Sequence, residues 1–278
     1  MIKVTLNNGI EMPQIGLGTF QTTNPKECRR SVLDALEIGY RLIDTAQGYG
    51  NEQFIGEALA ESSVPRKDIF LVTKVWMGNY ENAYESVLQS MERLHTDYLD
   101  LVLLHWPFGD VYKAWRDLEG LYHEGKARAI GVSNFNAGRL IDLINYNEVV
   151  PSVNQIETNI YSQQEKNREW MDKYGVQHMG YAPFGQGHIN EVYDNPQLKA
   201  IAEAHHKTTR QVVLRFQLQI GCVVIPKSVH KQRLEENFNI FDFELSPQEM
   251  QTIASMNREQ PLIGNPENPA LVESSRKW

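Results

Sequence analysis

Short apolar runs alternate with longer helical patterns along this chain of 278 residues, and no other feature constrains the fold as much. The runs are apolar throughout, without alternating polar positions, which indicates parallel strands buried on both faces. The predicted strands span residues 15–17, 41–43, 69–73, 99–104, 127–132, 153–156, 176–181 and 222–225. About eight units of strand and helix close most naturally into a (β/α)8 TIM barrel, an α/β fold whose active site lies at the carboxyl ends of its strands.

Helices are expected between these strands and on either side of the series. The helical patterns span residues 52–61, 80–94, 111–124, 137–145, 163–173 and 197–219, and a further helix is expected after Val229. The longest of these patterns is expected to break into two helices near Lys207. Asn24 and Pro25 are typical of the cap and first residue of an earlier helix, which we expect to end at Gly39.

The start of the chain predicts an N-terminal β-hairpin ahead of the barrel. Residues 3–6 and 10–12 flank Asn-Asn-Gly at residues 7–9, and an Asn-Gly pair is the strongest short hairpin signal. The rival fold is a doubly wound sheet, whose dinucleotide-binding form normally carries Gly-x-Gly-x-x-Gly after an early strand. Here Gly-Leu-Gly at residues 16–18 is followed by glutamine where the third glycine belongs. No linker divides the chain, so we expect a single barrel domain over residues 1–278.

Composition and charge bound the class of protein. Hydrophobic residues at 41% and charged residues at 22% describe an ordinary globular protein with enough apolar mass for a sizeable core. The net charge of −8 argues against nucleic acid as a partner. With only Cys28 and Cys222, no disulfide framework is implied, and we expect a cytoplasmic protein. The sequence shows no signal peptide and no apolar stretch that could span a bilayer, so we expect no membrane partner, and we expect a monomer.

Asp44, Tyr49, Lys74 and His105 each follow a short apolar run, at the point where a buried strand would end. Charged or titratable groups are costly to bury there, so they need partners or a function. In a barrel, the carboxyl ends of the strands converge on one face. A carboxylate, a phenol, an ammonium and an imidazole brought together on that face would form a proton-transfer site.

Tyr49 is the candidate proton donor of this site. The ordinary pKa of a tyrosine is about 10, and a nearby ammonium such as that of Lys74 could lower it by about one to three pKa units. Asp44 would keep Lys74 charged through an ion pair, while His105 would donate a hydrogen bond to a substrate carbonyl oxygen. From spacing alone, the alternative is a structural ion pair between Asp44 and Lys74, with Tyr49 and His105 merely packed beside it.

Several stretches of the sequence resemble the aldo-keto reductase superfamily, over essentially the whole chain. They read GLGTF around Gly18, LIDTAQGYGNE around Asp44, LVTKVW ending at Trp76, LLHWP around His105, AIGVSNF around Ser133, VNQIE around Gln155 and IPKSVHKQRLEEN from Ile225. The resemblance implies that the catalytic set is Asp44, Tyr49, Lys74 and His105. It also implies a (β/α)8 barrel that binds NADPH in an extended form, without a Rossmann domain, and acts on a small-molecule carbonyl substrate.

The same resemblance implies where NADPH binds. It assigns to the cofactor Gly18, Thr19, Ser133, Asn134, Gln155 and Tyr181 at the nicotinamide end, and Lys227, Ser228, Arg233, Glu236 and Asn237 at the adenosine end. The resemblance implies that Tyr181 stacks on the nicotinamide ring and that Lys227, Ser228 and Arg233 hold the 2′-phosphate. From the residues alone, cations beside a helix start also indicate an anion site, although a solvated basic surface explains the same charges.

Aromatic residues predict a substrate pocket beside the candidate acid. The expected substrate-binding residues are Phe20, Trp76, His105 and Trp106, although aromatic residues at strand ends are more often part of a core. The chain resembles the compact bacterial type, including 2,5-diketo-D-gluconate reductases, which implies α-dicarbonyls, keto-sugars or small aldehydes as substrates. A metal site is not expected, since the paired histidines at residues 205–206 have no carboxylate companion at ligand spacing.

Two other functions stay open from the sequence. Lys74 could form a Schiff base and make the chain an aldolase, since a buried lysine can be activated in this way. The chain could also bind the cofactor as a regulatory protein without turnover. The intact set of Asp44, Tyr49, Lys74 and His105 favours an enzyme. We therefore expect NADPH-dependent reduction of aldehydes and ketones to alcohols, with Tyr49 as the proton donor.

Overall fold

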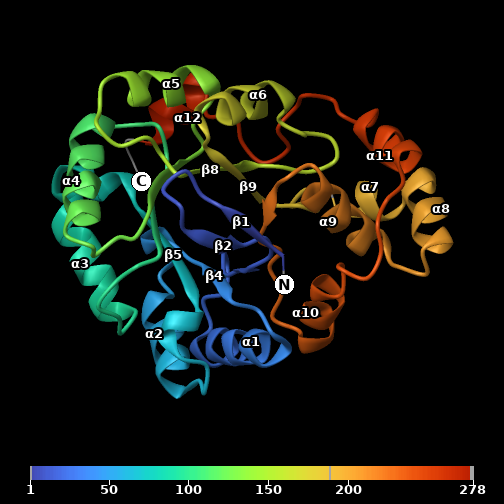
Figure 1. Cartoon of the computed structure of the whole chain (residues 1–278), viewed down its shortest axis with the longest axis horizontal. Helices are drawn as coiled ribbons and strands as arrows, with labels where there is room; N and C mark the ends of the chain where they lie inside the picture. The colour runs from blue at the N-terminus through green and yellow to red at the C-terminus, as the bar shows by residue number, and fades with distance from the viewer. Residues whose placement is uncertain (1, 188, 276–278) are drawn as a thin grey trace.

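Eight parallel strands form one continuous sheet that curls into a barrel, and helices surround it (Figure 1). This computed structural model describes residues 2–187 and 189–275. The barrel strands are β3 (Leu17–Gly18), β4 (Leu42–Asp44), β5 (Phe70–Val75), β6 (Leu101–Leu104), β7 (Ile130–Ser133), β8 (Val153–Glu157), β9 (Gln177–Tyr181) and β10 (Val223–Val224). Parallel bridges from Ile15 to Val224 and from Gly18 to Lys227 join the two ends of the sheet. The predicted (β/α)8 barrel is therefore confirmed.

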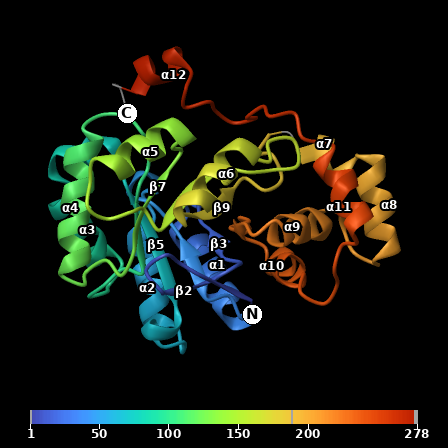
Figure 2. The ribbon, with the colours of Figure 1, turned by 45° about the horizontal axis from the view of Figure 1, so that its top comes forward.

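The helices lie outside the barrel, as Figure 2 shows from a second direction. They are α1 (Pro25–Ile38), α2 (Glu52–Glu61), α3 (Ala83–Arg93), α4 (Val111–His123), α5 (Ala137–Asn145), α6 (Glu165–Tyr174), α7 (Ile189–Tyr193), α8 (Pro196–Ala204), α9 (Thr209–Gln219), α10 (Lys231–Phe238), α11 (Pro247–Ala254) and α12 (Pro269–Ser274). The predicted break near Lys207 is confirmed, because α8 ends at Ala204 and the Thr208 side chain caps α9. Within the described ranges, none of these helices has the length and apolar character needed to cross a membrane.

The helix predicted over residues 80–94 begins later than expected. Met77–Asn82 forms a 3-10 helix, η3, and the α-helix starts only at Ala83. Glycine and asparagine, which both occur within η3, have low α-helix propensity. The chain therefore makes a tighter helical turn directly after β5, the strand that contains Lys74, and after Trp76.

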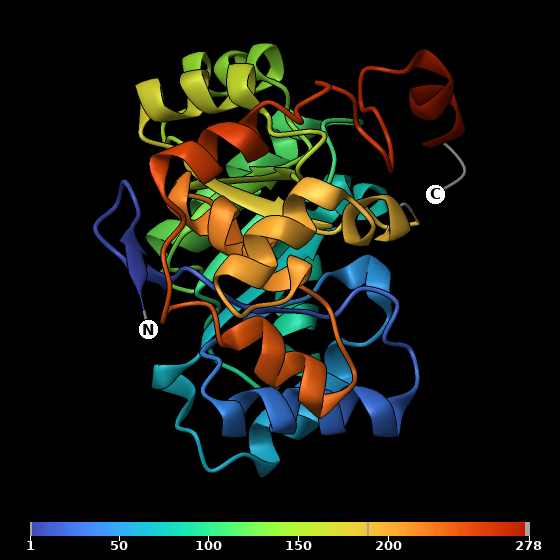
Figure 3. The same cartoon turned by 90° about the vertical axis from the view of Figure 1, so that its right-hand side faces the viewer.

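The N-terminal hairpin closes one end of the barrel. Its strands, β1 (Lys3–Thr5) and β2 (Glu11–Pro13), pair antiparallel as predicted. Leu6 and Met12 are buried against the apolar side chains that fill the barrel. Figure 3 shows the hairpin on one side of the molecule and α12 on the opposite side. The hairpin therefore leaves the other end of the barrel for a ligand site.

Inward-facing side chains repeat at every second residue of a strand. The apolar cluster inside the barrel contains Leu42, Val72, Leu103, Val153, Met179 and Ile225. Two residues further along the chain in each case stand Asp44, Lys74, His105, Gln155, Tyr181 and Lys227. The polar residues predicted for the site therefore continue the inward-facing rows of the apolar core, at the end away from the hairpin.

Candidate active site

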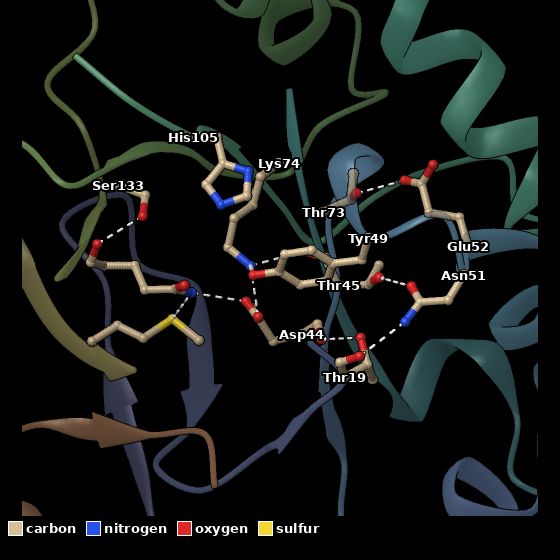
Figure 4. Close-up of polar contacts among 12 residues, drawn as sticks. Thr19, Asp44, Thr45, Tyr49, Asn51, Glu52, Thr73, Lys74, His105 and Ser133 are labelled. Carbon is tan, nitrogen blue, oxygen red and sulfur yellow. Dashed lines mark hydrogen bonds and ion pairs between the residues drawn. The ribbon is translucent and has the colours of Figure 1, made fainter. Parts of the chain in front are cut away.

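A buried ion pair between Asp44 and Lys74 lies at the centre of the site (Figure 4). Lys74 Nζ lies 2.6 Å from Asp44 Oδ1, and the side chains of Lys74 and Asp44 are 0% and 2% exposed. The ammonium also donates to Thr45 O at 2.8 Å and to Tyr49 Oη at 3.3 Å. Gln155 Nε2 donates to Asp44 Oδ2 at 2.8 Å, so both carboxylate oxygens have partners. Hydrogen bonds therefore fix the position of both charges.

The sequence predicted that Lys74 follows the end of its strand, but in the structure Lys74 lies within β5. β5 continues to Val75, which pairs with Leu104 of β6. The sequence pattern ended the strand at residue 73 because a charged residue interrupts the apolar run. In the structure the Asp44 carboxylate compensates that charge, so the strand pairing continues past it. His105 follows the end of β6 directly, as predicted.

Tyr49 ends a short 3-10 turn, η1 (Gln47–Tyr49), that follows β4. Its ring lies 5.7 Å from that of His105, measured between centroids, with the two planes nearly perpendicular. Gln47 holds this turn in place, since its side-chain oxygen accepts a hydrogen bond from Trp76 N at 2.9 Å. The turn, the end of β5 and the residue after β6 thus place the phenol, the ammonium and the imidazole together (Figure 4).

Burial controls the protonation of Tyr49 and His105. Burial, and then the charge of Asp44, raises the pKa of the Tyr49 phenol well above its usual value of 10.0. The expectation that Lys74 lowers this pKa is therefore wrong, because removal from water and the nearby carboxylate outweigh the ammonium. Burial, and then the charge of Lys74, holds the pKa of His105 well below 6.5. At neutral pH the phenol keeps its proton and the imidazole is uncharged.

His105 lies among aromatic rings with one ring nitrogen unpaired. Its ring centroid is 5.2 Å from that of Trp76 and 6.3 Å from that of Trp106. Nδ1 is buried and has no hydrogen-bond partner among the described residues. A neutral imidazole that leaves Nδ1 unprotonated carries its proton on Nε2. In the tautomer with its proton on Nε2, His105 can donate a hydrogen bond through that atom.

A cavity of about 780 Å³ adjoins these residues, which is within the usual range for a small-molecule site. From the predicted catalytic and substrate sets, it is lined by Phe20, Asp44, Tyr49, Trp76, His105 and Trp106. From the predicted cofactor set, it is lined by Gly18, Thr19, Ser133, Asn134, Gln155, Tyr181 and Lys227. Lys74 lies behind this lining and reaches the cavity through its bond to Tyr49. One cavity thus brings together the predicted acid, aromatic and nicotinamide residues.

Sequence reasoning missed part of the cavity wall. The further lining residues are Gln21, Ala182, Pro183, Phe184, Gln186, Gly187, Ile225, Ile263, Gly264 and Leu271. Gln21, Asn134 and Ala182 have φ values of 59°, 64° and 51°, a left-handed conformation that residues other than glycine rarely adopt. Such backbone is often found at functional sites; asparagine adopts it more readily than other residues, so only Asn134 carries a sequence signal for it.

Polar groups at the predicted nicotinamide end bond to one another. Asn134 Nδ2 donates to His105 O at 2.9 Å, and Tyr181 Oη donates to Asn134 Oδ1 at 2.8 Å. Ser133 Oγ donates to Gln155 O at 2.8 Å. These bonds hold two amides and two hydroxyl groups at the wall of a cavity whose charged lining residues are Asp44 and Lys227. Such groups can exchange hydrogen bonds with an uncharged amide ligand.

The residues predicted for the adenosine end lie at and after the Lys227 rim of the cavity, toward α10. Lys227 and Arg233 are exposed, and neither has a carboxylate partner among the residues that the structure describes. Asn237 Oδ1 is buried and, within the same ranges, unpaired. Glu236 differs from this pattern, since it accepts a hydrogen bond from Thr208 Oγ1 at 2.6 Å. This bond links Glu236 to the start of α9, and its predicted place near the adenine stays a prediction.

Ser228 shapes the turn that leads into α10. Its side chain is buried and accepts a hydrogen bond from His230 N at 3.1 Å. His230 then precedes the first residue of the helix, Lys231, whose ammonium pairs with Glu37 at 2.7 Å. Lys231 is therefore engaged with α1, in contrast to Lys227 and Arg233. Across the described ranges, no group of three or more His, Cys, Asp or Glu side chains is arranged to hold a metal ion.

Comparison with known proteins decides the family. The model of the aldo/keto reductase family matches residues 14–258. The chain belongs to this family. It is 45% identical over 269 residues to glyoxal reductase of Bacillus subtilis (strain 168), an alignment that covers 95% of this chain and 96% of the relative. It is 38% identical over 267 residues to methylglyoxal reductase DkgA of Escherichia coli (strain K12), with 95% and 96% covered. These relationships identify the chain as an oxidoreductase.

Solved structures of the family share the fold. An aldo-keto reductase enzyme from a Medee basin deep-sea metagenome library superposes with a TM-score of 0.93 at 40% identity, covering 95% of this chain and 98% of that chain. A Bombyx mori aldo-keto reductase, solved in complex with NADP, superposes with a TM-score of 0.89 at 32% identity and 95% coverage of both chains.

Proposed function

We propose that this aldo/keto reductase reduces aldehydes and ketones to alcohols with NADPH, and that Tyr49 is the proton donor. The observation that carries the proposal is the contact of a protonated phenol with the buried Asp44–Lys74 pair at the wall of the cavity. His105 adds an uncharged donor beside the phenol. Two donors next to each other can both bind one carbonyl oxygen, which a purely structural ion pair would not require.

The chain offers suitable groups for NADPH along its expected path. At the nicotinamide end, Ser133, Asn134 and Gln155 supply amide and hydroxyl groups for a carboxamide. At the other end, Lys227 and Arg233 are cations without a carboxylate partner among the described residues, which suits a phosphate. The unpaired Oδ1 of Asn237 could accept a hydrogen bond from the amino group of adenine. The NADP complex of the Bombyx mori relative supports the same choice of cofactor.

The proposed chemistry follows from the protonation states. A reduced nicotinamide, when bound, supplies a hydride to the carbonyl carbon. The Tyr49 hydroxyl gives its proton to the carbonyl oxygen, while His105 Nε2–H donates a hydrogen bond to the same oxygen. Lys74 already donates to the phenol oxygen, and this bond strengthens as negative charge develops there. Asp44 keeps the ammonium in place, so the raised pKa of Tyr49 ensures a protonated acid without leaving its anion unsupported.

The contacts of Lys74 argue against the aldolase alternative. A Schiff base requires a neutral amine with a free lone pair and access to substrate. Burial lowers the pKa of Lys74, which by itself favours a neutral amine, but the charge of Asp44 opposes that change. All three ammonium hydrogens have acceptors, namely Asp44, Thr45 O and Tyr49. The amine is also fully buried, so the phenol rather than the lysine meets the cavity.

Small α-dicarbonyls are the substrate class that we propose first. The two curated relatives compared above are named a glyoxal reductase and a methylglyoxal reductase. The predicted substrate end of the cavity is aromatic, with the donors of Tyr49 and His105 as its reactive polar groups. Such a wall suits small uncharged carbonyl compounds, whose oxygens need one or two donors and whose carbons tolerate apolar contact.

The direct test is a spectrophotometric assay of NADPH consumption with glyoxal, methylglyoxal, simple aldehydes and a keto-sugar. We expect carbonyl-dependent oxidation, faster with the α-dicarbonyls, and much slower turnover with NADH. Borohydride trapping with each substrate serves as the aldolase control, because it would fix a Schiff base on Lys74 and leave the reductase unmodified. Nucleotide binding without any carbonyl-dependent oxidation would instead indicate the regulatory alternative.

A further inference from the structure

A second buried carboxylate lies at the same end of the barrel and takes no part in the chemistry above. Glu157 is the last residue of β8 and is 3% exposed. Its Oε1 accepts a hydrogen bond from Leu262 N at 2.7 Å, and its Oε2 accepts one from Ile263 N at 3.0 Å. Asn159 Nδ2 donates to Oε1 at 3.0 Å. The carboxylate thus binds two consecutive backbone amides that are more than a hundred residues away in sequence. They belong to residues 255–275, which follow α11 and which we call the C-terminal segment.

Strand β8 connects this contact to the candidate active site. Gln155 and Glu157 are two residues apart on one strand, so their side chains leave the same face. Gln155 Nε2 holds Asp44 Oδ2 inside the barrel, and Glu157 holds the C-terminal segment at the rim. Glu157 also pairs in register with Tyr181 of β9, the residue proposed to stack on the nicotinamide ring. Glu157, which holds the segment, therefore lies on the same strand as Gln155, which donates a hydrogen bond to the ion pair.

The segment held by Glu157 forms part of the cavity wall. After α11 the chain runs across the end of the barrel to α12, as Figure 2 shows. Ile263, Gly264 and Leu271 line the cavity of about 780 Å³ beside Tyr49 and His105. Ile263, one of the two residues whose amide binds Glu157, is a large apolar side chain with 40% of its surface exposed. Where the anchor places Ile263 therefore determines the shape of this wall.

Packing alone does not hold the segment in place. Its other side borders a second cavity of about 450 Å³, lined among others by Pro261, Asn265 and Pro266. Leu262 packs against the apolar cluster that contains Ile253, whereas Ile263 is 40% exposed and Gly264 lines both cavities. The other polar contacts of the segment include the hydrogen bond from Arg258 N to Tyr161 O at 2.9 Å and surface ion pairs such as Lys166 with Glu259, which are 80% and 52% exposed. Exposed ion pairs contribute little, whereas a buried carboxylate that loses its donors is costly.

We propose that Glu157 is a positioning residue that seats the C-terminal segment on the cavity and so selects for substrates with an apolar side chain. This inference rests on the proposed carbonyl reduction. A substrate such as phenylglyoxal extends from the reacting carbonyl toward the wall that Ile263 and Leu271 form, while glyoxal has no side chain to reach it. Loss of the anchor should then weaken binding of the larger substrate and leave the reacting groups as they are.

Glu157→Gln tests the proposal, because it keeps the size of the side chain but turns one acceptor into an amide donor facing a backbone N–H. We expect the KM for phenylglyoxal to rise roughly tenfold, as loss of about one charge-assisted hydrogen bond implies. We expect kcat, the KM for glyoxal and the Kd for NADPH each to change less than about twofold. Trypsin should also cleave faster after Arg258, in the released segment.

The chain offers a matched control in Glu119. This carboxylate is 9% exposed and also accepts hydrogen bonds from two consecutive backbone amides, Glu148 N at 2.9 Å and Val149 N at 2.8 Å. It lines neither of the two cavities. Glu119→Gln should therefore leave the KM for phenylglyoxal and cleavage after Arg258 unchanged. Any general cost of losing a buried carboxylate appears equally in both variants.

A second variant covers a failure of Glu157→Gln to fold. Leu262→Pro removes one of the two amide donors from the surface segment and leaves the barrel unaltered, and we expect the same rise in the KM for phenylglyoxal. Equal effects of Glu157→Gln and Glu119→Gln, or equal losses with glyoxal and phenylglyoxal, would overturn the proposal. If none of the carbonyl substrates supports NADPH oxidation by the wild type, the proposed function fails. The rate of cleavage after Arg258 still reports whether Glu157 holds the segment.

Discussion

The two ends of the site hold their charges in opposite ways. At the acid end, Asp44 and Lys74 are buried, paired and hydrogen-bonded on every side. At the proposed phosphate end, Lys227 and Arg233 lie exposed, with no carboxylate partner among the described residues. A buried charge without a partner is very costly, so the fold has to supply one, whereas an exposed cation needs only water. The acid end is therefore complete in the protein alone, and we propose that a nucleotide phosphate completes the other end.

This difference predicts where substitutions act. Changes at the acid end should alter turnover and stability, because its groups support one another. Changes at the phosphate end should alter nucleotide affinity and little else, and salt should screen them. The predictions below are ordered by the size of the expected effect.

The largest effect is expected for Tyr49→Phe, which removes the hydroxyl and keeps the ring. Turnover should fall about a hundred- to ten-thousand-fold, the usual contribution of general acid catalysis. The Kd for NADPH, followed through tryptophan fluorescence, should stay nearly unchanged because the hydroxyl lies at the substrate side of the site. Wild-type turnover in this variant would remove Tyr49 from the mechanism.

Lys74→Met should lower turnover roughly a hundred- to a thousand-fold, because the phenol oxygen loses its charged donor. It should also destabilise the protein by about 3 to 5 kcal/mol, since Asp44 is left buried without its partner. Chemical denaturation measures that loss. The double variant Asp44→Asn with Lys74→Met removes both charges, so most of the stability should return while turnover stays low. Recovery of both would show that the pair serves only the fold.

At the phosphate end, Arg233→Ala should weaken NADPH binding about ten- to a hundred-fold and NADH binding little, because NADH has no 2′-phosphate. High salt should diminish the difference. Lys231→Ala is the matched control, since that neighbouring ammonium is already paired with Glu37. Equal weakening of NADPH and NADH by Arg233→Ala would mean that the arginine supports the fold or the shared adenosine.

The smallest effect is expected from pH. Burial and the charge of Lys74 hold the pKa of His105 well below 6.5, so its neutral form persists above that lowered pKa and is lost only as the pH falls through it. The kcat/KM for methylglyoxal should therefore change less than about twofold between about pH 6 and pH 8. A decline near pH 6.5 that disappears in His105→Gln would show that the imidazole titrates normally.

The same comparison explains which parts of the site the sequence predicts. Asp44, Lys74 and His105 are recognisable because a charged or titratable residue at the end of an apolar run stands out. Because strand side chains alternate, the residues two positions after Leu42, Val72 and Leu103 must face the barrel interior. Position at the end of a buried strand thus predicts that these three side chains meet, whereas the role of Tyr49 rests on the resemblance to the family.

Other features depend on contacts that the local sequence does not contain. Ile263 and Leu271 reach the cavity only because the segment after α11 crosses the barrel. The hydrogen bond from Thr208 to Glu236 joins two residues 28 positions apart, and no local sequence signal predicts it. The pKa of Tyr49 was predicted in the wrong direction, because a sequence shows the nearby ammonium but not the extent of burial. Long-range packing and desolvation account for each of these differences.

The most direct test of the site as a whole is to follow the hydride. NADPH labelled with deuterium at C4 of the nicotinamide would be incubated with methylglyoxal and the wild-type protein, and the product examined by NMR. We expect one deuterium on the new carbinol carbon for each labelled hydride transferred, and almost none with Tyr49→Phe. Two results would contradict carbonyl reduction at this site. The alcohol could carry no deuterium, whichever face of the nicotinamide C4 is labelled, or the wild type and Tyr49→Phe could transfer deuterium equally.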